Sequence, residues 1–304
     1  MGAYHHEELV AALHVRLGDG PAELFLGQLA GIVATLAERW QVDMREPMGG
    51  GGRSVVIAGR RAQQDVILKV SPVPDELTGE IAALQAWSTT SSIAQSSIAP
   101  AVLEVAPAEG AYLMERILPG ERVRLHGPPT AHDLDRIASI FETIAQSSAH
   151  NTVPAAIDVL QERSRGLAPD LAQGWPPECP PPVEVLQSRV QHALQRLPAG
   201  TALLHGDCWK GNILVGDQRW MAIDPYGWQG RIEIDIALFS VSAGWGDNYE
   251  SWRDGLARRL PIDVGVCDDA ARIWAVDRCA VACRYGYSAA TRVPTLLALS
   301  DRLS

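Results

Sequence analysis

The sequence predicts an α+β protein in two parts, a small sheet-containing part followed by a larger, mainly helical part. Up to about residue 117, the apolar patterns follow the order strand, strand, helix, strand, strand, with two helices ahead of them. Beyond that point, residues 131–149, 183–197 and 267–287 have helical periodicity. We therefore expect one domain over residues 1–117 and a second over residues 118–304.

The small part is predicted to begin with helices at residues 6–18 and 21–40, before Pro47 and four glycines (49–52) break the helical pattern. The apolar runs "SVVIA" (54–58) and "DVILKV" (65–70) then predict two strands joined by a polar turn. Residues 72–87 start with prolines and an aspartate and then place Leu77, Ile81 and Leu84 on one helical stripe. A further strand, turn and strand follow in "AVLEVAP" (101–107) and "AYLMERI" (111–117).

In the larger part, the helix at 131–149 is followed by a proline-rich stretch at 166–182, for which we expect no regular structure. After the helix at 183–197, short strands are predicted at 201–204, 212–215 and 219–223. The rest of the chain is predicted to be mostly helical.

The composition is that of an ordinary globular protein, with 304 residues, 47% hydrophobic and 20% charged. A formal net charge of -10 argues against a nucleic-acid partner, which needs a basic surface. Five cysteines without a C-x-x-C pair favour a reducing, cytoplasmic compartment. The N-terminus does not resemble a signal peptide, and no apolar run approaches the length of a membrane span. We expect a soluble protein, a monomer or weak dimer, with no membrane partner.

The segment "LLHGDCWKGNILV" (203–215) places several polar groups between two apolar runs, and "MAIDPYG" (221–227) ends another apolar run on a carboxylate. Asp207 and Asn212 lie five residues apart in the loop, and Asp224 follows the next hairpin strand. Phosphoryl transfer needs such a set: one carboxylate accepts the proton of an attacking hydroxyl, while an amide and a second carboxylate hold Mg²⁺. Two protein oxygens suffice, because Mg²⁺ takes its other ligands from phosphate and water.

The small part offers the complementary positive charge. Lys69 lies inside the apolar run "VILKV" and so needs a partner. Glu80, on the next helix, matches the strand-lysine and helix-glutamate pair that anchors nucleotide phosphates in kinases, and Glu76, one turn earlier, is a rival partner. Backbone N–H groups of the glycines at 49–52 are candidates to cover phosphates.

The order Lys69, Glu80, "HGDxxxxN" and "IDP" resembles the kinase-like phosphotransferases. The segments "VILKV…GEIAALQAW", "AYLMERILPG", "LLHGDCWKGNIL" and "MAIDPYG" resemble the aminoglycoside 6-phosphotransferase (streptomycin kinase) and hydroxyurea kinase family. The similarity extends from about residue 40 to about residue 290. It implies a bilobal, protein-kinase-like fold with a small sheet-containing N-lobe and a larger, mainly helical C-lobe.

By this resemblance Asp207 is the catalytic base, Asn212 and Asp224 bind Mg²⁺, and ATP is the phosphoryl donor. His205 braces the catalytic loop and Asp235 secures it by hydrogen bonds. The resemblance also implies a set of residues that bind the nucleotide, in which backbone groups at 115–117 meet adenine: Lys69, Glu80, Ser54, Glu115, Arg116 and Ile117.

The chain departs from relatives near the expected acceptor side, where Trp209 replaces the usual histidine or lysine and "IDPYGWQGRIEID" brings Tyr226 and Arg231. Trp209, Tyr226 and Trp228 are candidates to stack on a substrate ring, with ordinary packing as the alternative. Asp247, Glu250 and Asp254 form a candidate acidic patch for an amino or guanidino substrate, with a solvated helix face as the alternative.

These observations predict an ATP-dependent O-phosphotransferase that acts on a hydroxyl of a small amino-substituted molecule, a streptomycin-like aminoglycoside, which would confer antibiotic resistance. An amino sugar, hydroxyurea or another metabolite would require the same catalytic residues. Two alternatives lie outside the kinases: a catalytically silent nucleotide-binding pseudokinase, and a metallophosphoesterase, which needs further histidines to bind two metal ions.

Overall fold

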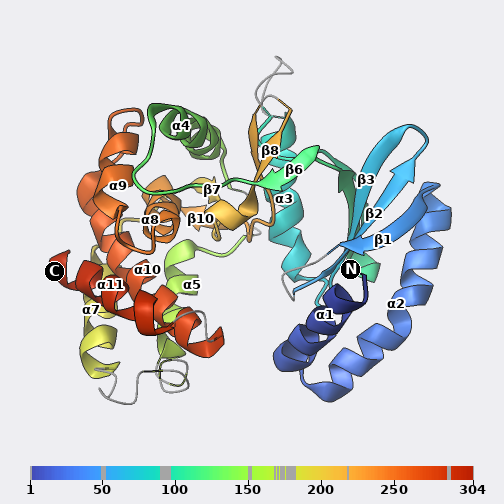
Figure 1. Ribbon diagram of the computed structural model, residues 1–304, viewed down its shortest axis with the longest axis horizontal. Helices are drawn as coiled ribbons and strands as arrows, with labels where there is room; N and C mark the ends of the chain where they lie inside the picture. The colour runs from blue at the N-terminus through green and yellow to red at the C-terminus, as the bar shows by residue number, and fades with distance from the viewer. Residues whose placement is uncertain are drawn as a thin grey trace. The chain divides into compact units, whose positions relative to one another are not determined.

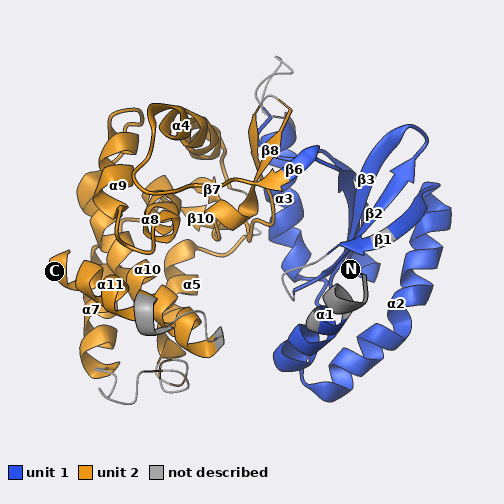
Figure 2. Cartoon of the chain, viewed as in Figure 1, with its two compact units in different colours: residues 1–120 blue, residues 121–304 orange. Residues whose placement is uncertain are grey.

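The computed structural model describes residues 2–48, 53–89, 97–149, 153–167, 169, 171, 175, 183–217, 219–285 and 289–303. The chain forms two compact units, residues 1–120 and residues 121–304 (Figure 2). The sequence-based boundary, after residue 117, lies slightly earlier in the chain. Each unit is described by itself.

Unit 1 is built on a five-stranded antiparallel sheet with the strand order β1-β2-β3-β5-β4 (Figure 1). Its strands are β1 (Asp43–Met48), β2 (Val55–Arg61), β3 (Gln64–Val70), β4 (Val102–Ala106) and β5 (Ala111–Glu115). The sequence analysis missed β1 because Pro47 was read as a break. β1 is an edge strand whose register shifts between Met44 and Pro47, and edges and bulges are where a sheet accepts proline.

Helices α1 (Gly2–Leu17) and α2 (Asp19–Trp40) form a hairpin that packs on one face of this sheet. Gly18, at φ 79°, makes the turn between them in a conformation that favours glycine. The core that they share with the sheet contains Leu9, Leu13, Ala22, Phe25, Leu36, Trp40, Val55, Val66, Leu68, Val70 and Leu113.

Helix α2 corrects one expectation, because its 22 residues and mean hydropathy of 1.3 make it long and apolar enough to cross a membrane by length and composition alone. In unit 1 its Phe25, Leu36 and Trp40 pack into the core on the sheet. A helix that covers one face of a sheet satisfies the same test of composition.

Helix α3 (Glu76–Thr89) follows β3 and buries Leu77, Ala83, Leu84 and Trp87, whereas Ile81 is only partly buried. A short 3₁₀ turn, η1 (Pro107–Glu109), connects β4 to β5. The alternation of side chains along β3 assigns its two faces: Val66, Leu68 and Val70 join the core with α1 and α2, and Lys69 points to the opposite face.

The strands of unit 2 form two antiparallel pairs: β8 (Ile213–Gly216) with β9 (Trp220–Ala222), and β7 (Ala202–Leu204) with β10 (Trp228–Gly230). β6 (Pro119–Arg122) spans the boundary between the two units. The sequence analysis missed β6 and β10, since strands of three or four residues are too short to show alternation. The 3₁₀ turn η2 (Lys210–Asn212) leads into β8.

Helices make up most of unit 2, and α8 lies at its centre, with every residue from Glu233 to Ala243 buried. A helix that is apolar all round is a core helix, and α10 packs along α8 while also contacting α7 and α11. The helices are α4 (Ala131–Gln146), α5 (Ala156–Arg165), α7 (Val183–Arg196), α8 (Ile232–Ala243), α9 (Tyr249–Ala257), α10 (Val264–Tyr285) and α11 (Ala289–Arg302).

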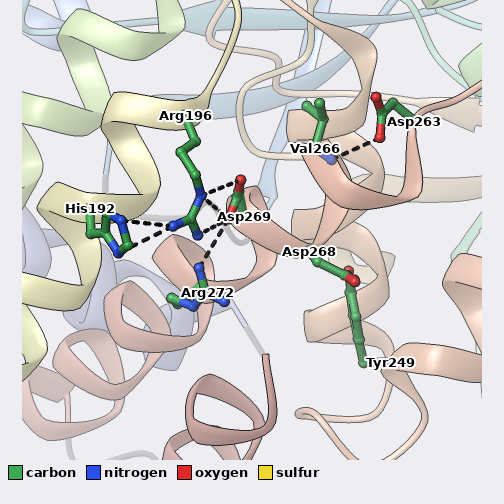
Figure 3. Close-up of polar contacts among 8 residues, drawn as sticks. All are labelled: His192, Arg196, Tyr249, Asp263, Val266, Asp268, Asp269 and Arg272. Atoms are coloured by element: carbon green, nitrogen blue, oxygen red, sulfur yellow. Dashed lines mark hydrogen bonds and ion pairs between the residues drawn. The ribbon is translucent and has the colours of Figure 1, made fainter. Parts of the chain in front are cut away.

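Polar contacts fix the first turns of α10 against its neighbours (Figure 3). Arg196 of α7 donates to both oxygens of Asp269, at 3.1 and 2.9 Å from Nε, and Tyr249 of α9 donates to Asp268 at 2.7 Å. Asp263 accepts backbone N–H groups of the first turn of α10. The end of α10 beyond these contacts is thereby positioned beside α8.

The proline-rich stretch at 166–182 lies largely outside the described residues. Leu167 and Leu171, which are described, are helical and buried. The expectation that this stretch has no regular structure is therefore wrong for these two positions, where burial of leucine side chains outweighs the nearby prolines.

Candidate active site

The buried face of the unit 1 sheet opposite α1 and α2 carries a charged pair. Lys69 is 4% exposed and Glu80 is 1% exposed, and Lys69 Nζ donates to Glu80 Oε1. Tyr112, the cross-strand neighbour of Lys69 on β5, donates its hydroxyl to the same Glu80 oxygen at 2.7 Å. Buried charges are retained only when they are paired, so this cluster fixes α3 against β3 and β5.

The rival partner, Glu76, is occupied elsewhere in unit 1. Its carboxylate pairs with Arg16 of α1 and lies 3.6 Å from Arg53. Glu76 therefore helps to attach α1 to the start of α3, while Glu80 is the partner of Lys69.

The segment expected to meet adenine begins at the end of β5. Glu115 donates its backbone N–H to Ala101 O at 2.9 Å, and Arg116 donates to Asp65 O at 3.1 Å. Among the described residues, the N–H of Ile117 is the one of these three that donates no hydrogen bond. Of these three backbone N–H groups, that of Ile117 is therefore the one that could donate to adenine.

Two further nucleotide expectations concern the turn before β2. Ser54 is buried at 5% exposure directly ahead of that strand. The glycines at 49–52 lie outside the described residues, so their expected contact with phosphates stays a prediction.

In unit 2, Asp235 holds the turn that precedes Asp207. Its side chain is fully buried in the first turn of α8, where Oδ2 accepts the His205 N–H at 2.6 Å and Oδ1 accepts the Gly206 N–H at 2.9 Å. Burial raises the pKa of Asp235 to about 7, and the Asp207 carboxylate adds to the rise, while the two N–H donors oppose it. Both carboxylate oxygens are thus committed to the backbone of the loop.

His205 connects the two loops of the site. Its buried ring accepts the Asp207 N–H on Nδ1 at 3.3 Å, so the hydrogen lies on Nε2, which contacts Ile223 O at 3.0 Å. The His205 carbonyl accepts the Tyr226 N–H at 2.7 Å. His205 therefore positions the backbone on both sides of Asp224, with its ring at Ile223 and its carbonyl at Tyr226.

Asn212 orients the carboxylate of Asp207. Its Nδ2 donates to the Asp207 carbonyl at 3.0 Å and to Asp207 Oδ2 at 3.1 Å. Both partners are acceptors, which assigns the nitrogen to this side and directs the amide oxygen away from Asp207. That oxygen is the atom of Asn212 that can bind a cation.

Asp224 follows β9 in a left-handed conformation, at φ 58°. Aspartate and asparagine are the side-chain-bearing residues that best tolerate this region. The bend directs the chain out of the β8–β9 hairpin directly after Ile223, whose N–H is bonded to Asn212 O at 2.9 Å. This backbone hydrogen bond joins Asn212 to the residue before Asp224, and so connects the two expected metal ligands.

The donor set fits Mg²⁺ better than a transition metal. Asn212 and Asp224 offer an amide oxygen and a carboxylate, which are the hard ligands that Mg²⁺ accepts in small number. Among the described residues, no group of three or more His, Cys, Asp or Glu side chains is arranged to hold a metal ion. The described part of the chain therefore does not supply the histidine-rich pair of sites that a metallophosphoesterase needs.

The side chains after Asp207 serve the packing of the loop. Cys208 is fully buried, which raises the pKa of its thiol well above the usual value and keeps the thiol neutral. The indole of Trp209 covers Gly211, where an added Cβ would lie 2.4 Å from the ring. Trp209 thereby restricts position 211 to glycine, and its expected contact with substrate stays a prediction.

Trp228 is almost fully buried within an aromatic stack. Its ring lies 5.3 Å from that of Tyr226 at 13° and 6.3 Å from that of Trp274 at 3°. It also packs on Gly206, at φ 76°, where a Cβ would lie 2.7 Å from the indole. Trp228 is 4% exposed, which favours the packing alternative, whereas Tyr226 is half-buried.

The expected acidic patch is largely neutralised by arginines. Glu250 pairs with Arg302 at 3.2 Å, and Asp254 pairs with Arg253 at 2.8 Å. Asp247 is exposed. Arg231, the other departure noted in the sequence, pairs with the buried Glu233 of α8. The geometry thus favours the solvated-face alternative for this patch.

Sequence reasoning missed three charged residues beside the catalytic loop, namely Arg163 on α5 and Asp277 and Arg278 on α10. Arg163 lies 5.4 Å over the ring of Tyr226, and Asp277 pairs with both arginines. The signal was present in "IWAVDRCAVAC" (273–283), where two adjacent charges interrupt an apolar helix.

The sequence and the fold of this chain are similar to those of several known proteins. The sequence profile of the fructosamine kinase family matches residues 180–266, which include the catalytic loop and Asp224. A hydroxyurea phosphotransferase of Kitasatospora aureofaciens is 25% identical over 270 residues, covering 88% of this chain and 75% of the relative.

Solved structures resemble most of the chain. The choline kinase LicA from Streptococcus pneumoniae superposes with a TM-score of 0.65 at 13% identity, covering 91% of this chain and 99% of that chain. A thermostable mutant of aminoglycoside phosphotransferase APH(4)-Ia gives 0.62 at 14% identity, covering 88% and 98%. Another mutant of that enzyme was solved as a ternary complex with ADP and hygromycin B.

The chain has the fold of these small-molecule phosphotransferases. The predicted α+β, protein-kinase-like fold is thereby confirmed. The relatives matched by sequence are named kinases or phosphotransferases of small molecules.

Replacement of Glu80 by glutamine tests the buried pair of unit 1. Glu80→Gln leaves the Lys69 ammonium buried without a counter-charge, which should cost on the order of 3 kcal/mol of stability and raise KM for ATP. Glu76→Gln is the matched control, because it removes the same charge from α3 at a residue that pairs with Arg16. Steady-state kinetics at varied ATP decide the matter, and equal KM values for both variants would contradict the assignment.

Replacement of Asp235 tests the anchor of the catalytic loop. Asp235→Asn presents an amide NH₂ to one of two backbone N–H groups, so we expect a loss of about 2 kcal/mol of stability and a fall in kcat, with KM for ATP little changed. Glu233→Gln, in the same buried turn of α8, should also destabilise but should keep kcat. A kcat of Asp235→Asn equal to that of Glu233→Gln would refute the role of Asp235.

Proposed function

We propose that this protein transfers the γ-phosphoryl group of ATP to a hydroxyl of a small molecule, with Asp207 as the catalytic base. The observation that carries the proposal is the constraint on Asp207: Asp235 fixes the preceding turn, His205 accepts its N–H, and Asn212 orients its carboxylate. A carboxylate held this firmly is suited to accept a proton from a positioned hydroxyl.

In the proposed reaction, Asp207 orients the acceptor hydroxyl and takes its proton as the oxygen forms a bond to the γ-phosphorus. The bond from that phosphorus to the β–γ bridging oxygen breaks, and ADP leaves with the electron pair. Asn212 and Asp224 would hold Mg²⁺, which neutralises charge on the phosphates when it is bound. Lys69, kept in place by Glu80, would contact the phosphates of the same nucleotide.

The use of ATP is supported by the presence of all four chemical positions: Lys69, Asp207, Asn212 and Asp224. A pseudokinase would have no need of the three-fold constraint on Asp207. The ADP complex of the aminoglycoside phosphotransferase, a fold relative, agrees with this choice of nucleotide.

For the acceptor we propose a small hydroxylated molecule of the hydroxyurea kind. The support is the 25% identical hydroxyurea phosphotransferase, whose match covers most of this chain. The aminoglycoside expectation, and with it a role in antibiotic resistance, came from the family resemblance. The acidic patch that would suit the amino groups of such a substrate has Glu250 and Asp254 already paired with arginines. We further propose a reducing, cytoplasmic location, since four buried cysteines are free thiols in the described part of the chain.

The role of Asp207 is tested by Asp207→Asn, which keeps the size of the side chain and removes the base. Loss of general-base catalysis should lower kcat by roughly 10²- to 10⁴-fold while ATP binding is retained. ADP release with hydroxyurea as acceptor and equilibrium binding of ATP are the two measurements. Retention of wild-type kcat would refute the assignment.

The role of Asp224 is tested by Asp224→Asn. Asparagine also tolerates the φ of 58°, so this variant removes the charge without straining the backbone, as alanine would. We expect the Mg²⁺ concentration for half-maximal activity to rise by about tenfold or more. Asp224→Ala should show the same shift with an added loss of stability of about 1 kcal/mol from the backbone. An unchanged Mg²⁺ requirement in the asparagine variant would exclude Asp224 as a ligand.

A further inference from the structure

An aromatic stack leads from the catalytic turn to a pair of arginines. Trp228 packs on Gly206, the residue before Asp207, and Tyr226 stacks on the outer face of Trp228. Tyr226 is also tied to the turn by its N–H, which bonds to His205 O at 2.7 Å. The position of the stack is therefore fixed relative to Asp207.

Two guanidinium groups lie against this stack. Arg163 Cζ is 5.4 Å from the ring centres of both Tyr226 and Trp228 and 5.8 Å from that of Trp274. Arg278 Cζ is 5.7 Å from Trp274. Guanidinium groups that rest on aromatic faces keep their N–H edges available for planar oxygen ligands.

One carboxylate serves both arginines. Asp277 lies 3.7 Å from Arg163 and 2.7 Å from Arg278. Burial raises the pKa of Asp277, but Arg278, Arg163 and Arg284 together hold it below the usual value. Burial likewise lowers the pKa of Arg278, but the carboxylates of Asp277 and Asp207 keep it above the usual value. Apart from Asp207, the cluster thus contains two guanidinium groups, Arg163 and Arg278, and one carboxylate, Asp277.

The two guanidinium groups affect which acceptor molecules can approach Asp207. A polycationic acceptor would bring its charges beside Arg163 and Arg278, whereas a carbonyl or carboxylate oxygen would accept hydrogen bonds from Arg163. The acidic groups that would attract a polycation, Glu250 and Asp254, are themselves in ion pairs.

We propose that the acceptor of this kinase is neutral or anionic, and that Arg163, set against the stack of Tyr226, Trp228 and Trp274, binds a carbonyl or carboxylate oxygen of the acceptor. Arg278, whose Nε and Nη2 donate to Asp277, adds positive charge behind it. The proposal rests on the proposed phosphotransfer function and adds the chemical class of the acceptor. Arg163, with 31% of its side chain exposed, is the accessible member of the pair, and Arg278, at 13%, supports it from within.

The test compares ligands that differ mainly in charge. D-glucuronate (anionic), hydroxyurea (neutral), D-glucosamine (cationic) and streptomycin (polycationic) are titrated into the full-length protein with Mg-ADP, and binding is followed by tryptophan fluorescence. We expect glucuronate and hydroxyurea to saturate at concentrations at least tenfold lower than glucosamine and streptomycin. Tighter or equal binding of the cationic ligands, or no saturation by any of the four, would overturn the proposal.

Variants of Arg163 assign the effect to the cluster. Arg163→Gln should reduce the preference for glucuronate over glucosamine at least fivefold, and Arg163→Lys, which keeps the charge, should retain more of it. Arg258→Gln, which removes an exposed arginine at the end of α9, is the matched control and should keep the full preference. An unchanged preference in Arg163→Gln, with an unchanged thermal midpoint, would also overturn the proposal.

Measurements of turnover distinguish a failure of the proposed phosphotransfer function from a failure of the proposed acceptor class. If Asp207→Asn keeps wild-type turnover, the proposed function fails even when the charge preference is seen. If Asp207→Asn is inactive and wild-type enzyme phosphorylates streptomycin with a higher kcat/KM than hydroxyurea, the function stands and the acceptor class proposed here is wrong.

Discussion

The conformation of the loop that carries Asp207 depends on a single buried carboxylate. Asp235 receives no solvent, and both of its oxygens accept backbone N–H groups from the turn before Asp207. Desolvation of an aspartate is costly unless hydrogen bonds compensate it, so the burial of Asp235 and the shape of the turn stabilise each other. Because Asp235 lies in the core helix α8, the position of the loop is set by the most deeply packed element of unit 2.

From this anchor the other polar groups follow by direct contact. His205 joins the turn to the end of β9, and Asn212 completes the orientation of Asp207 from the following 3₁₀ turn. The aromatic stack rests on Gly206, where any side chain would collide with Trp228. Arg163 on α5 and Arg278 on α10 lie against that stack. The stack therefore connects these two arginines to the turn before Asp207, although they are distant from it in the sequence.

Unit 1 likewise depends on a small set of buried polar groups. Alternation along β3 separates an apolar face, which packs under α1 and α2, from the face that carries Lys69. Glu80 and Tyr112 satisfy the lysine from the neighbouring helix and strand. The pair therefore depends on the register between β3 and β5, since Lys69 and Tyr112 are directly opposite one another.

The sequence by itself determined the long helices, the strands that alternate clearly, and the polar residues of the catalytic loop, because periodicity and motif spacing are local properties. It did not reveal β1, β6 or β10, which are short or contain proline, and it left the partner of Lys69 open between Glu76 and Glu80. Only the tertiary structure decided that choice, by pairing Glu76 with Arg16. It also brought together Arg163, Asp277 and Tyr226, which are far apart in the chain and whose contacts arise only when α5 and α10 pack around one buried aromatic stack.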